Sequence, residues 1–176
     1  MVAWSRPLAT RRLRLLSLNI NGLSLVAKRR ALFSRLFEMG HDIIVLQETH
    51  CDGDETADAW LRAGAGAGRP WGGRAFWSHG RRASRGVAVL FRAGFPGSDF
   101  EIEFADSDPR GAPGVGASTD PGGRVLRVGW RDTQTGERWS VLAAYAPNSD
   151  SEQRAFYAPS GPLWTALLAG PDTPNV

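Results

Sequence analysis

Three apolar runs, each ending in a compact polar cluster, constrain the fold of this chain more than any other feature. Residues 13–20 alternate loosely, residues 43–46 are entirely apolar, and residues 139–145 are again mostly apolar. Short runs of these kinds are typical of strands. The clusters at their ends are Asn19-Ile20-Asn21-Gly22, Gln47-Glu48-Thr49-His50 and Tyr145-Ala146-Pro147-Asn148. Because α/β scaffolds commonly display functional groups at strand ends, these clusters are the first candidates for a site.

The segments between these runs predict a layered α/β fold. Apolar positions recur at helical spacing over 24–39, with Ser24 as N-cap and Gly40 as C-terminal stop. Further strands are expected at 74–79, 86–91, 100–104 and 124–130. The first two are joined by a basic turn at 80–85, and the last is joined to 139–145 by a turn around 134–136. Residues 107–123 are rich in Pro and Gly and predict a loop. Residues 149–169 are partly helical with a break near 159–162, and 174–176 resemble the entry to another strand.

Length and composition limit the class of protein. A chain of 176 residues with 42% hydrophobic and 22% charged residues is typical of one globular domain. No apolar run has the length of a membrane span. The basic N-terminus lacks the apolar core of a signal peptide, and the single cysteine, Cys51, argues weakly against a disulfide-stabilised secreted protein. We therefore expect an intracellular protein that is not secreted, with a basic tail at 1–12 and a domain at 13–176.

Charge is distributed unevenly along the chain. Residues 1–36 carry eight basic and no acidic side chains, residues 41–60 carry six acidic and no basic ones, and residues 61–95 carry seven arginines and no acidic side chain. Since 20 of the 21 basic residues are arginine, base-composition bias in the coding sequence explains part of this pattern. An acidic block between two basic ones is also the arrangement that a metal site within a phosphate-binding surface needs.

The residue types in the polar clusters suit phosphoryl transfer. Glu48 places a carboxylate at the end of a buried strand, and Mg²⁺ prefers a few such oxygen ligands together with water. Tyr145 and Asn148 offer O–H and N–H donors for phosphate oxygens. Structural alternatives stay open: Asn19 as a turn residue, Glu48 as a solvated surface group, and the third cluster as a strand terminator. His50 and His79 are expected to be structural or solvent-facing rather than catalytic.

The three clusters, in this order, resemble motifs of the endonuclease/exonuclease/phosphatase superfamily. The resemblance spans roughly 13–148, and it is closest to the exonuclease III-like nucleases and, among them, to the endonuclease domain of LINE-type retrotransposons. Lys28-Arg29-Arg30, His50 and the segment 84–90 also resemble the retrotransposon branch. The resemblance implies a DNase I-like, four-layer α/β sandwich of two packed mixed sheets covered by helices, of which this chain holds the N-terminal portion.

The same resemblance implies an activity and a set of roles. Asn19 and Glu48 would lie at a metal site for Mg²⁺, with Mn²⁺ as the alternative cation and Glu48 as the direct carboxylate ligand. Tyr145 and Asn148 would complete the catalytic set by contacting the scissile phosphate. The implied reaction is hydrolysis of DNA by a magnesium-dependent endonuclease of retrotransposon type, without a membrane or an obligate protein partner. A nuclear location follows only from the retrotransposon resemblance.

Several motifs that complete the superfamily pattern do not occur in this sequence. The pattern continues with Gly-Asp-Phe-Asn, a later Asp and a terminal Ser-Asp-His, whereas no histidine follows His79 here. Because in-line displacement needs groups that position water and move protons, we expect negligible nuclease activity from the 176-residue chain. We also expect unpaired sheet edges and an uncovered inner face.

Other functions remain open at this point. The superfamily also includes phosphatases and phosphodiesterases that act on other substrates. A function of a different class is a non-catalytic remnant that binds nucleic acid through Arg81, Arg82 and Arg85, with an affinity that falls steeply with salt. A third alternative is a chain that does not fold stably.

Overall fold

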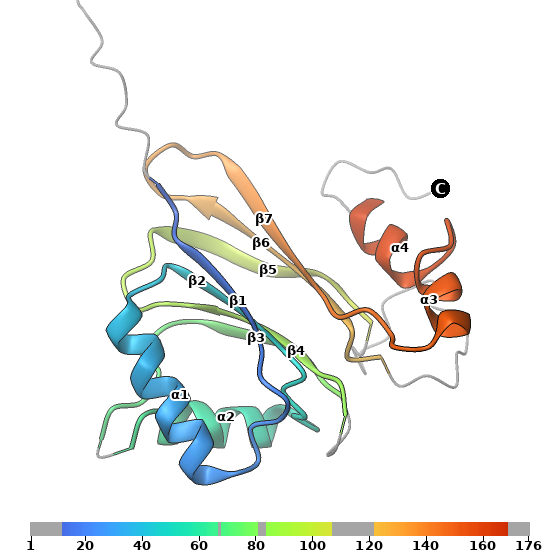
Figure 1. Cartoon of the computed structure of the whole chain (residues 1–176). Coiled ribbons are helices and arrows are strands. Elements are labelled where there is room, and N and C mark those ends of the chain that lie inside the picture. The colour runs from blue at the N-terminus through green and yellow to red at the C-terminus, as the bar shows by residue number, and fades with distance from the viewer. Residues whose placement is uncertain (1–11, 67, 81–83, 107–121, 169–176) are drawn as a thin grey trace, which may run out of the picture.

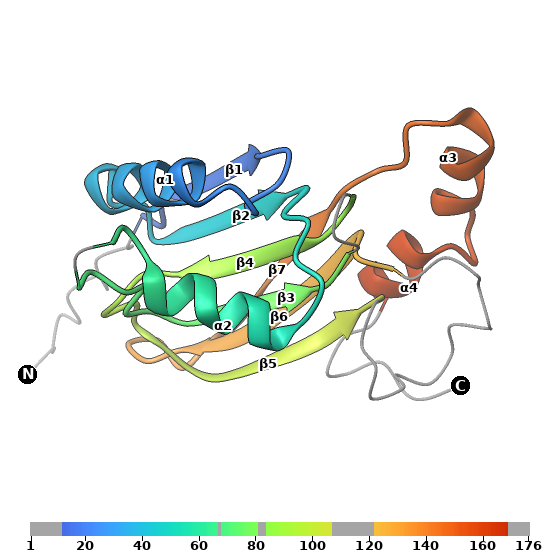
Figure 2. The ribbon, with the colours of Figure 1, turned by 90° about the horizontal axis from the view of Figure 1, so that it is seen from below.

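The computed structural model describes residues 12–66, 68–80, 84–106 and 122–168. These residues form two β-sheets packed face to face, with helices α1 and α2 outside the first sheet and helices α3 and α4 at one end (Figure 1). Figure 2 shows the same layers from below. This mixed α/β architecture confirms the fold class that the sequence predicted.

The first sheet has four strands in the order β1-β2-β4-β3. They are β1 (Leu15–Asn19), β2 (Ile43–Gln47), β3 (Ala75–Ser78) and β4 (Val87–Phe91). The first two are parallel, whereas β4 is antiparallel to both β2 and β3. The paired strands predicted around the basic turn are therefore confirmed. All five residues of β4 are buried, as its continuous apolar sequence indicates.

Two helices cover the outer face of this sheet. Helix α1 (Val26–Met39) buries Phe33 and Leu36, and helix α2 (Asp54–Ala63) buries Trp60. Their apolar side chains form one core cluster with the outward-facing residues of β2 and β4. Helix α2 was not predicted from the sequence, although its acidic first turn, with Asp54 and Glu55, and Arg62 in its last turn are helix signals.

The ends of α1 confirm one prediction and contradict another. Gly40 adopts a left-handed conformation, with φ 60°, and its N–H donates to the Leu36 carbonyl, as expected for a C-terminal stop. The N-cap is Leu25 rather than Ser24, and it makes no side-chain capping bond. The Ser24 prediction is wrong; in this turn the Arg29 side chain donates from Nη1 to the carbonyls of Leu23 and Ser24.

The second sheet is fully antiparallel, with the order β5-β6-β7. Its strands are β5 (Gly97–Ala105), β6 (Val125–Asp132) and β7 (Arg138–Ala144). The predicted turn between the last two is confirmed, since the Gly136 N–H donates to the Asp132 carbonyl at 2.9 Å. In the described part of the chain, β7 pairs on one side only and Trp139 is about half exposed, in line with the expected open edge.

The two sheets are held together by an aromatic core. The Phe91 ring, fully buried on β4, lies 4.9 Å from Phe95, 4.8 Å from Phe100 and 5.4 Å from Trp130 between ring centroids. Fully burying one such ring stabilises a fold by roughly 1.5–3 kcal/mol. This core fixes the distance and orientation between the sheets, and hence between the strand ends that carry the polar clusters.

Two short helices pack against the end of the second sheet. Helix α3 (Asp150–Phe156) has Ser149 as N-cap, and helix α4 (Pro162–Leu168) follows after the predicted break. Phe156 and Ala166 are buried against Phe104 and Val125. Most of the predicted loop at 107–123, the entry to a strand at 174–176 and most of the N-terminal tail lie outside the described residues.

Among the described residues, no helix is long and apolar enough to cross a membrane.

Candidate functional site

The three polar clusters lie at strand ends, as predicted. Asn19 is the last residue of β1, and Glu48 comes directly after β2. Because these strands are parallel, with Asn19 opposite Gln47, both side chains emerge at the same end of the first sheet. Tyr145 comes directly after β7 in the second sheet, and Asn148 lies three residues further on.

A hydrogen bond joins the first two clusters. Asn19 donates from Nδ2 to Oε1 of Glu48 at 2.9 Å, and its own Oδ1 accepts from the N–H of Asn21 at 3.1 Å. The Gly22 N–H donates to the Glu48 carbonyl at 2.6 Å, so the loop after β1 is pinned to the turn after β2. Lys28 of α1 adds a further tie, donating from Nζ to the Asn21 carbonyl at 2.8 Å.

The third cluster reaches the same place from the second sheet. Gln47 donates from Nε2 to the Ala144 carbonyl at 3.3 Å, which ties the end of β2 to the end of β7. The next residue along each strand completes the contact, because the Tyr145 hydroxyl donates to the Glu48 carboxylate. Asn148 in turn hydrogen-bonds the Tyr145 hydroxyl. The four predicted residues therefore lie together, with Asn19 hydrogen-bonded to Glu48 and the Tyr145 hydroxyl beside both Glu48 and Asn148.

The hydrogen bonds keep Glu48 ionised. The Tyr145 hydroxyl, followed by Asn19, lowers the pKa of the Glu48 carboxyl, although partial burial opposes them. For Tyr145, burial and the adjacent Glu48 carboxylate raise the pKa of the hydroxyl, so the phenol keeps its proton at neutral pH. The site thus presents a fixed negative charge beside a neutral O–H donor.

Unusual backbone conformations gather around this site. Of the five non-glycine residues described with positive φ, four are Asn21, Glu48, His50 and Arg85. The His50 N–H donates to the Arg85 carbonyl at 2.8 Å, so the turns that follow β2 and precede β4 hold each other. Such conformations are costly and are found most often at functional sites. Their concentration here supports a site at this end of the sheets.

The structure also brings two residues to the site that the sequence analysis did not assign to it. His50, expected to be structural, has Nε2 at 3.7 Å from Oε2 of Glu48. Arg124, which precedes β6, places its guanidinium 5.6 Å from the centroid of the Tyr145 ring. A signal for Arg124 was present in the sequence, since it begins the strand predicted to pair with the strand that ends at Tyr145.

Other predicted or charged residues lie elsewhere. Arg81 and Arg82 are outside the described residues, whereas Arg85 is described and only 18% of its side chain is exposed. His79 pairs with Asp54 at 2.8 Å and Asp42 with Arg92 at 2.8 Å. Both of these acids therefore have partners away from Glu48, and the acidic block does not converge as a whole.

The donor set at the site suits a hard cation. Within the described ranges, no group of three or more His, Cys, Asp and Glu side chains could hold a metal ion. Glu48 nevertheless offers an ionised carboxylate, and the neighbouring Asn19 side chain carries an amide oxygen, which accepts from the Asn21 N–H while Nδ2 faces Glu48. One carboxylate with a neutral oxygen donor is a plausible protein share for Mg²⁺, which keeps several of its own waters.

This chain is similar to a known protein family and to several solved structures. Residues 16–157 match the Endonuclease/Exonuclease/phosphatase family. The AP endonuclease LMAP from Leishmania major has a similar structure, with a TM-score of 0.62 and 21% identity over 89% of this chain and 48% of that chain. The structure of TDP2 from Caenorhabditis elegans gives a TM-score of 0.51 and 17% identity over 81% of this chain and 38% of that chain. No curated protein matched the sequence.

At these identities, the structural likeness establishes the fold, which is the DNase I-like fold that the sequence predicted. The chain spans about half the length of the first of these structures and less of the second.

Proposed function

Because this chain belongs to the endonuclease/exonuclease/phosphatase family, we propose that it carries part of the site of a magnesium-dependent phosphodiesterase that cleaves DNA. The observation that carries the proposal is the convergence of Asn19, Glu48, Tyr145 and Asn148: Asn19 donates to Glu48 at 2.9 Å, and the Tyr145 hydroxyl lowers the pKa of Glu48. These residues come from three separate strand ends and two sheets. Their convergence is what a shared cation and phosphate would require.

Glu48 and Asn19 are the residues that would hold the cation. The Tyr145 and Asn19 hydrogen bonds lower the pKa of Glu48 and hold its carboxylate in one orientation. When bound, Mg²⁺ would neutralise negative charge on a phosphate and on its leaving oxygen. Mn²⁺, which also takes carboxylate and amide oxygens, fits the same donors.

Tyr145 and Asn148 would orient the scissile phosphate. The raised pKa of Tyr145, caused by burial and by Glu48, keeps its O–H available as a donor. Asn148 is exposed and offers amide N–H groups beside it. Donors that are already positioned stabilise the charge that develops on the phosphate in the transition state without reorganising.

DNA is the proposed substrate on two grounds. The forms Asn19-Ile20-Asn21-Gly22 and Tyr145-Ala146-Pro147-Asn148 resemble DNA-cleaving members more than the phosphatases of the superfamily. The structural neighbour from Leishmania major is described as an AP endonuclease. The closer resemblance to retrotransposon endonucleases rests on the motifs alone and belongs to this proposal.

We assign none of the described residues to the role of activating the attacking water. We therefore expect the 176-residue chain alone to hydrolyse DNA at a negligible rate. What this chain supplies is cation binding by Glu48 and Asn19 and phosphate orientation by Tyr145 and Asn148.

Cation binding provides a test that does not depend on turnover. Mn²⁺ titration followed by electron paramagnetic resonance should detect a site in the parent chain, and Glu48→Gln should weaken it by about tenfold or more. Glu38→Gln is the matched control, because Glu38 carries the same charge on the exposed surface of α1, paired with Arg35. Equal Mn²⁺ affinity in the parent and Glu48→Gln, with both folded by circular dichroism, would refute the proposed metal site.

A plasmid-nicking assay with Mg²⁺ tests the remainder. Turnover that Glu48→Ala abolishes would support the site and contradict the expected inactivity of the chain. Turnover that survives Glu48→Ala would exclude this site as its source. Salt-sensitive DNA binding with neither turnover nor Mn²⁺ binding would favour the non-catalytic alternative.

A further inference from the structure

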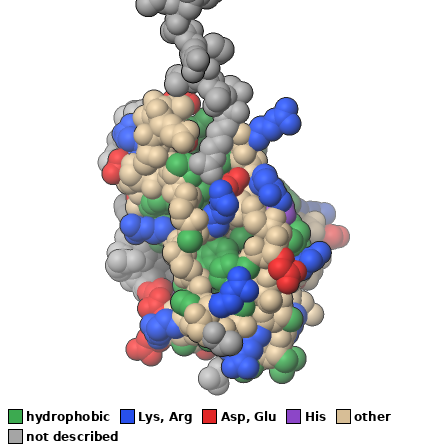
Figure 3. Space-filling view, turned by 90° about the vertical axis from the view of Figure 1, so that its left-hand side faces the viewer, with side chains coloured by type: hydrophobic (Ala, Val, Ile, Leu, Met, Phe, Trp, Pro, Cys, Tyr) green, Lys and Arg blue, Asp and Glu red, His purple; other side chains and the backbone are tan. Residues whose placement is uncertain are grey.

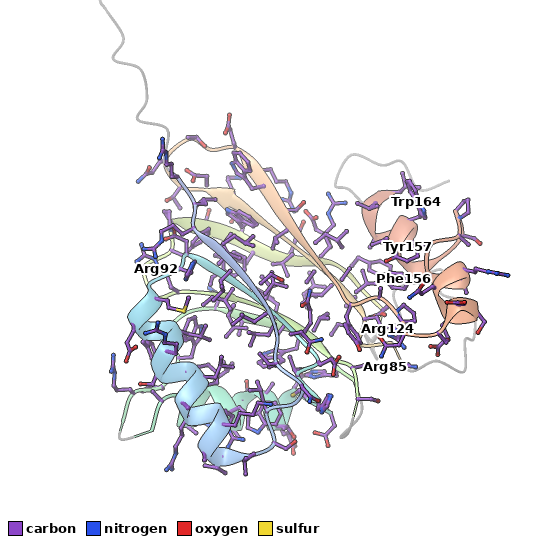
Figure 4. All side chains as sticks on the ribbon, in the orientation of Figure 1. Arg85, Arg92, Arg124, Phe156, Tyr157 and Trp164 are labelled. Atoms are coloured by element: carbon purple, nitrogen blue, oxygen red, sulfur yellow. The ribbon has the colours of Figure 1, made fainter. Side chains whose placement is uncertain are left out.

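Two arginines and one glutamate form a second charged cluster beside the candidate site. Arg85 (Nη2) lies 3.8 Å from Oε1 of Glu152, and Arg124 (Nη2) lies 3.8 Å from Oε2 of the same carboxylate. Only 18% of the Arg85 side chain and 9% of the Arg124 side chain are exposed, whereas 48% of the Glu152 side chain is exposed. Figure 4 shows both arginines at the end of the sheets that faces α3.

This cluster is connected directly to the proposed phosphate-binding residues. The Tyr145 N–H donates to the Arg124 carbonyl at 2.7 Å, and the Arg124 guanidinium lies over the Tyr145 ring. The backbone of Arg85 accepts the N–H of His50, two residues after Glu48. The backbones of both arginines are therefore tied to the segments that carry the candidate site.

Glu152 does not contact either arginine at hydrogen-bond distance. It sits on the short helix α3, where its carboxylate accepts a hydrogen bond from the Ser149 hydroxyl at 3.0 Å. Its distance of 3.8 Å to each arginine exceeds the usual length of a charge-assisted hydrogen bond. A half-exposed carboxylate in such a contact contributes little stability.

We propose that Arg85 and Arg124 form a second phosphate subsite, which binds the DNA phosphodiester adjacent to the scissile one, and that Glu152 occupies this subsite in the free protein. Guanidinium groups bind carboxylate and phosphate with the same donor geometry, so a substrate phosphate replaces Glu152 without moving either arginine. The identity of the anion as a DNA phosphate rests on the proposed function. The subsite itself follows from the three side chains.

The distribution of other basic groups agrees with this assignment. On the opposite end of the molecule, Lys and Arg side chains are spread among acidic and apolar ones (Figure 3). Arg92, which lies at that end (Figure 4), is paired with Asp42 at 2.8 Å. The Arg85 and Arg124 pair is distinguished by its position, since it borders the residues proposed to hold the scissile phosphate.

The experiment measures binding of a short fluorescein-labelled DNA duplex by fluorescence anisotropy, in EDTA and over roughly 50 to 200 mM salt. Glu152→Gln removes the competing charge but keeps a residue that suits the same position of a capping box. We expect it to raise DNA affinity by about fivefold. Arg85→Gln should lower the affinity and reduce the slope of log K against log salt by about one. Glu38→Gln, which removes the same charge from the exposed surface of α1, is the control and should have no comparable effect.

The double variant separates competition from general electrostatics. If Glu152 competes with DNA for Arg85, the gain from Glu152→Gln shrinks in the Arg85→Gln background. The proposal would be overturned if Glu152→Gln raised DNA affinity equally in the parent and in the Arg85→Gln variant. A rise of the same size in Glu38→Gln would also overturn it. If circular dichroism shows that Glu152→Gln does not fold, Arg85→Gln and Arg85→Lys provide the test instead. Only Arg85→Gln should reduce the slope of log K against log salt by about one. Because EDTA removes divalent cations, a failed metal site at Glu48 does not affect this result.

Discussion

Replacing Tyr145 with phenylalanine tests the contact on which the candidate site depends. The change removes one oxygen, and with it the hydrogen bond to Glu48 and the one from Asn148. The Tyr145 hydroxyl is the largest cause of the lowered pKa of Glu48, so the pKa of Glu48 should be higher in the variant. A hydrogen bond to a charged group contributes about 1.5–3 kcal/mol. Because 21% of the Glu48 side chain is exposed, we expect a loss near the lower end, about 1.5 kcal/mol at pH 7.

The loss should depend on pH in a defined direction. A carboxyl whose pKa is lowered by folding contributes stability that is present above its unfolded pKa and is lost as the pH falls through its folded pKa. The stabilities of the parent and Tyr145→Phe should therefore converge in acid. Urea unfolding at pH 7 and at acid pH, together with NMR titration of the Glu48 carboxyl carbon, measures both effects.

Tyr157→Phe is the matched control, because Tyr157 is the other tyrosine of the chain and is about half exposed at the end of α3. We expect its effect to stay within about 0.5 kcal/mol. A Glu48 pKa that is unchanged or lower in Tyr145→Phe would refute the proposed contact. So would a stability loss that persists undiminished in acid.

Three further predictions concern the scaffold of the site. Gly86→Ala should destabilise the chain by about 3 kcal/mol, because φ is +87° and the new Cβ would lie 2.3 Å from Oγ1 of Thr49. Gly94→Ala, at φ +73° with open space around it, should cost only about 1 kcal/mol, and urea unfolding compares the two. Phe91→Ala should cost about 3–5 kcal/mol by the same assay, with loss of near-ultraviolet dichroism, because its ring is fully buried between the sheets. Burial raises the pKa of the Cys51 thiol to about 11, so Ellman's reagent at pH 8 should label the folded chain at least about a hundredfold more slowly than the urea-unfolded chain.

The elements of the fold were largely predictable from the sequence. Apolar runs located the strands because a strand buried on both faces needs a continuous apolar sequence, and β4 is such a strand. Helix α2 and the start of α1 were not predicted correctly. At the start of α1, the Arg29 side chain is buried against the turn at Leu23, a contact that the sequence pattern does not reveal.

The charged residues show most clearly what sequence proximity does not decide. Glu48, Asp42 and Asp54 lie in one acidic block, yet the structure pairs Asp42 with Arg92 and Asp54 with His79 and leaves Glu48 at the site. Arg124, distant from all of them in sequence, lies over Tyr145. Charge spacing along the chain therefore did not predict which acidic residues lie at the site.

The sequence by itself determined the strands, their polar ends and the family, because periodicity and local motifs are properties of neighbouring residues. Only the tertiary structure decided that those ends meet. The hydrogen bond from Gln47 to the Ala144 carbonyl spans 97 residues, and it forms because the aromatic core around Phe91 sets how the two sheets pack. The hydrogen bonds of the site, the lowered pKa of Glu48 and the arginine pair at Glu152 all depend on that packing.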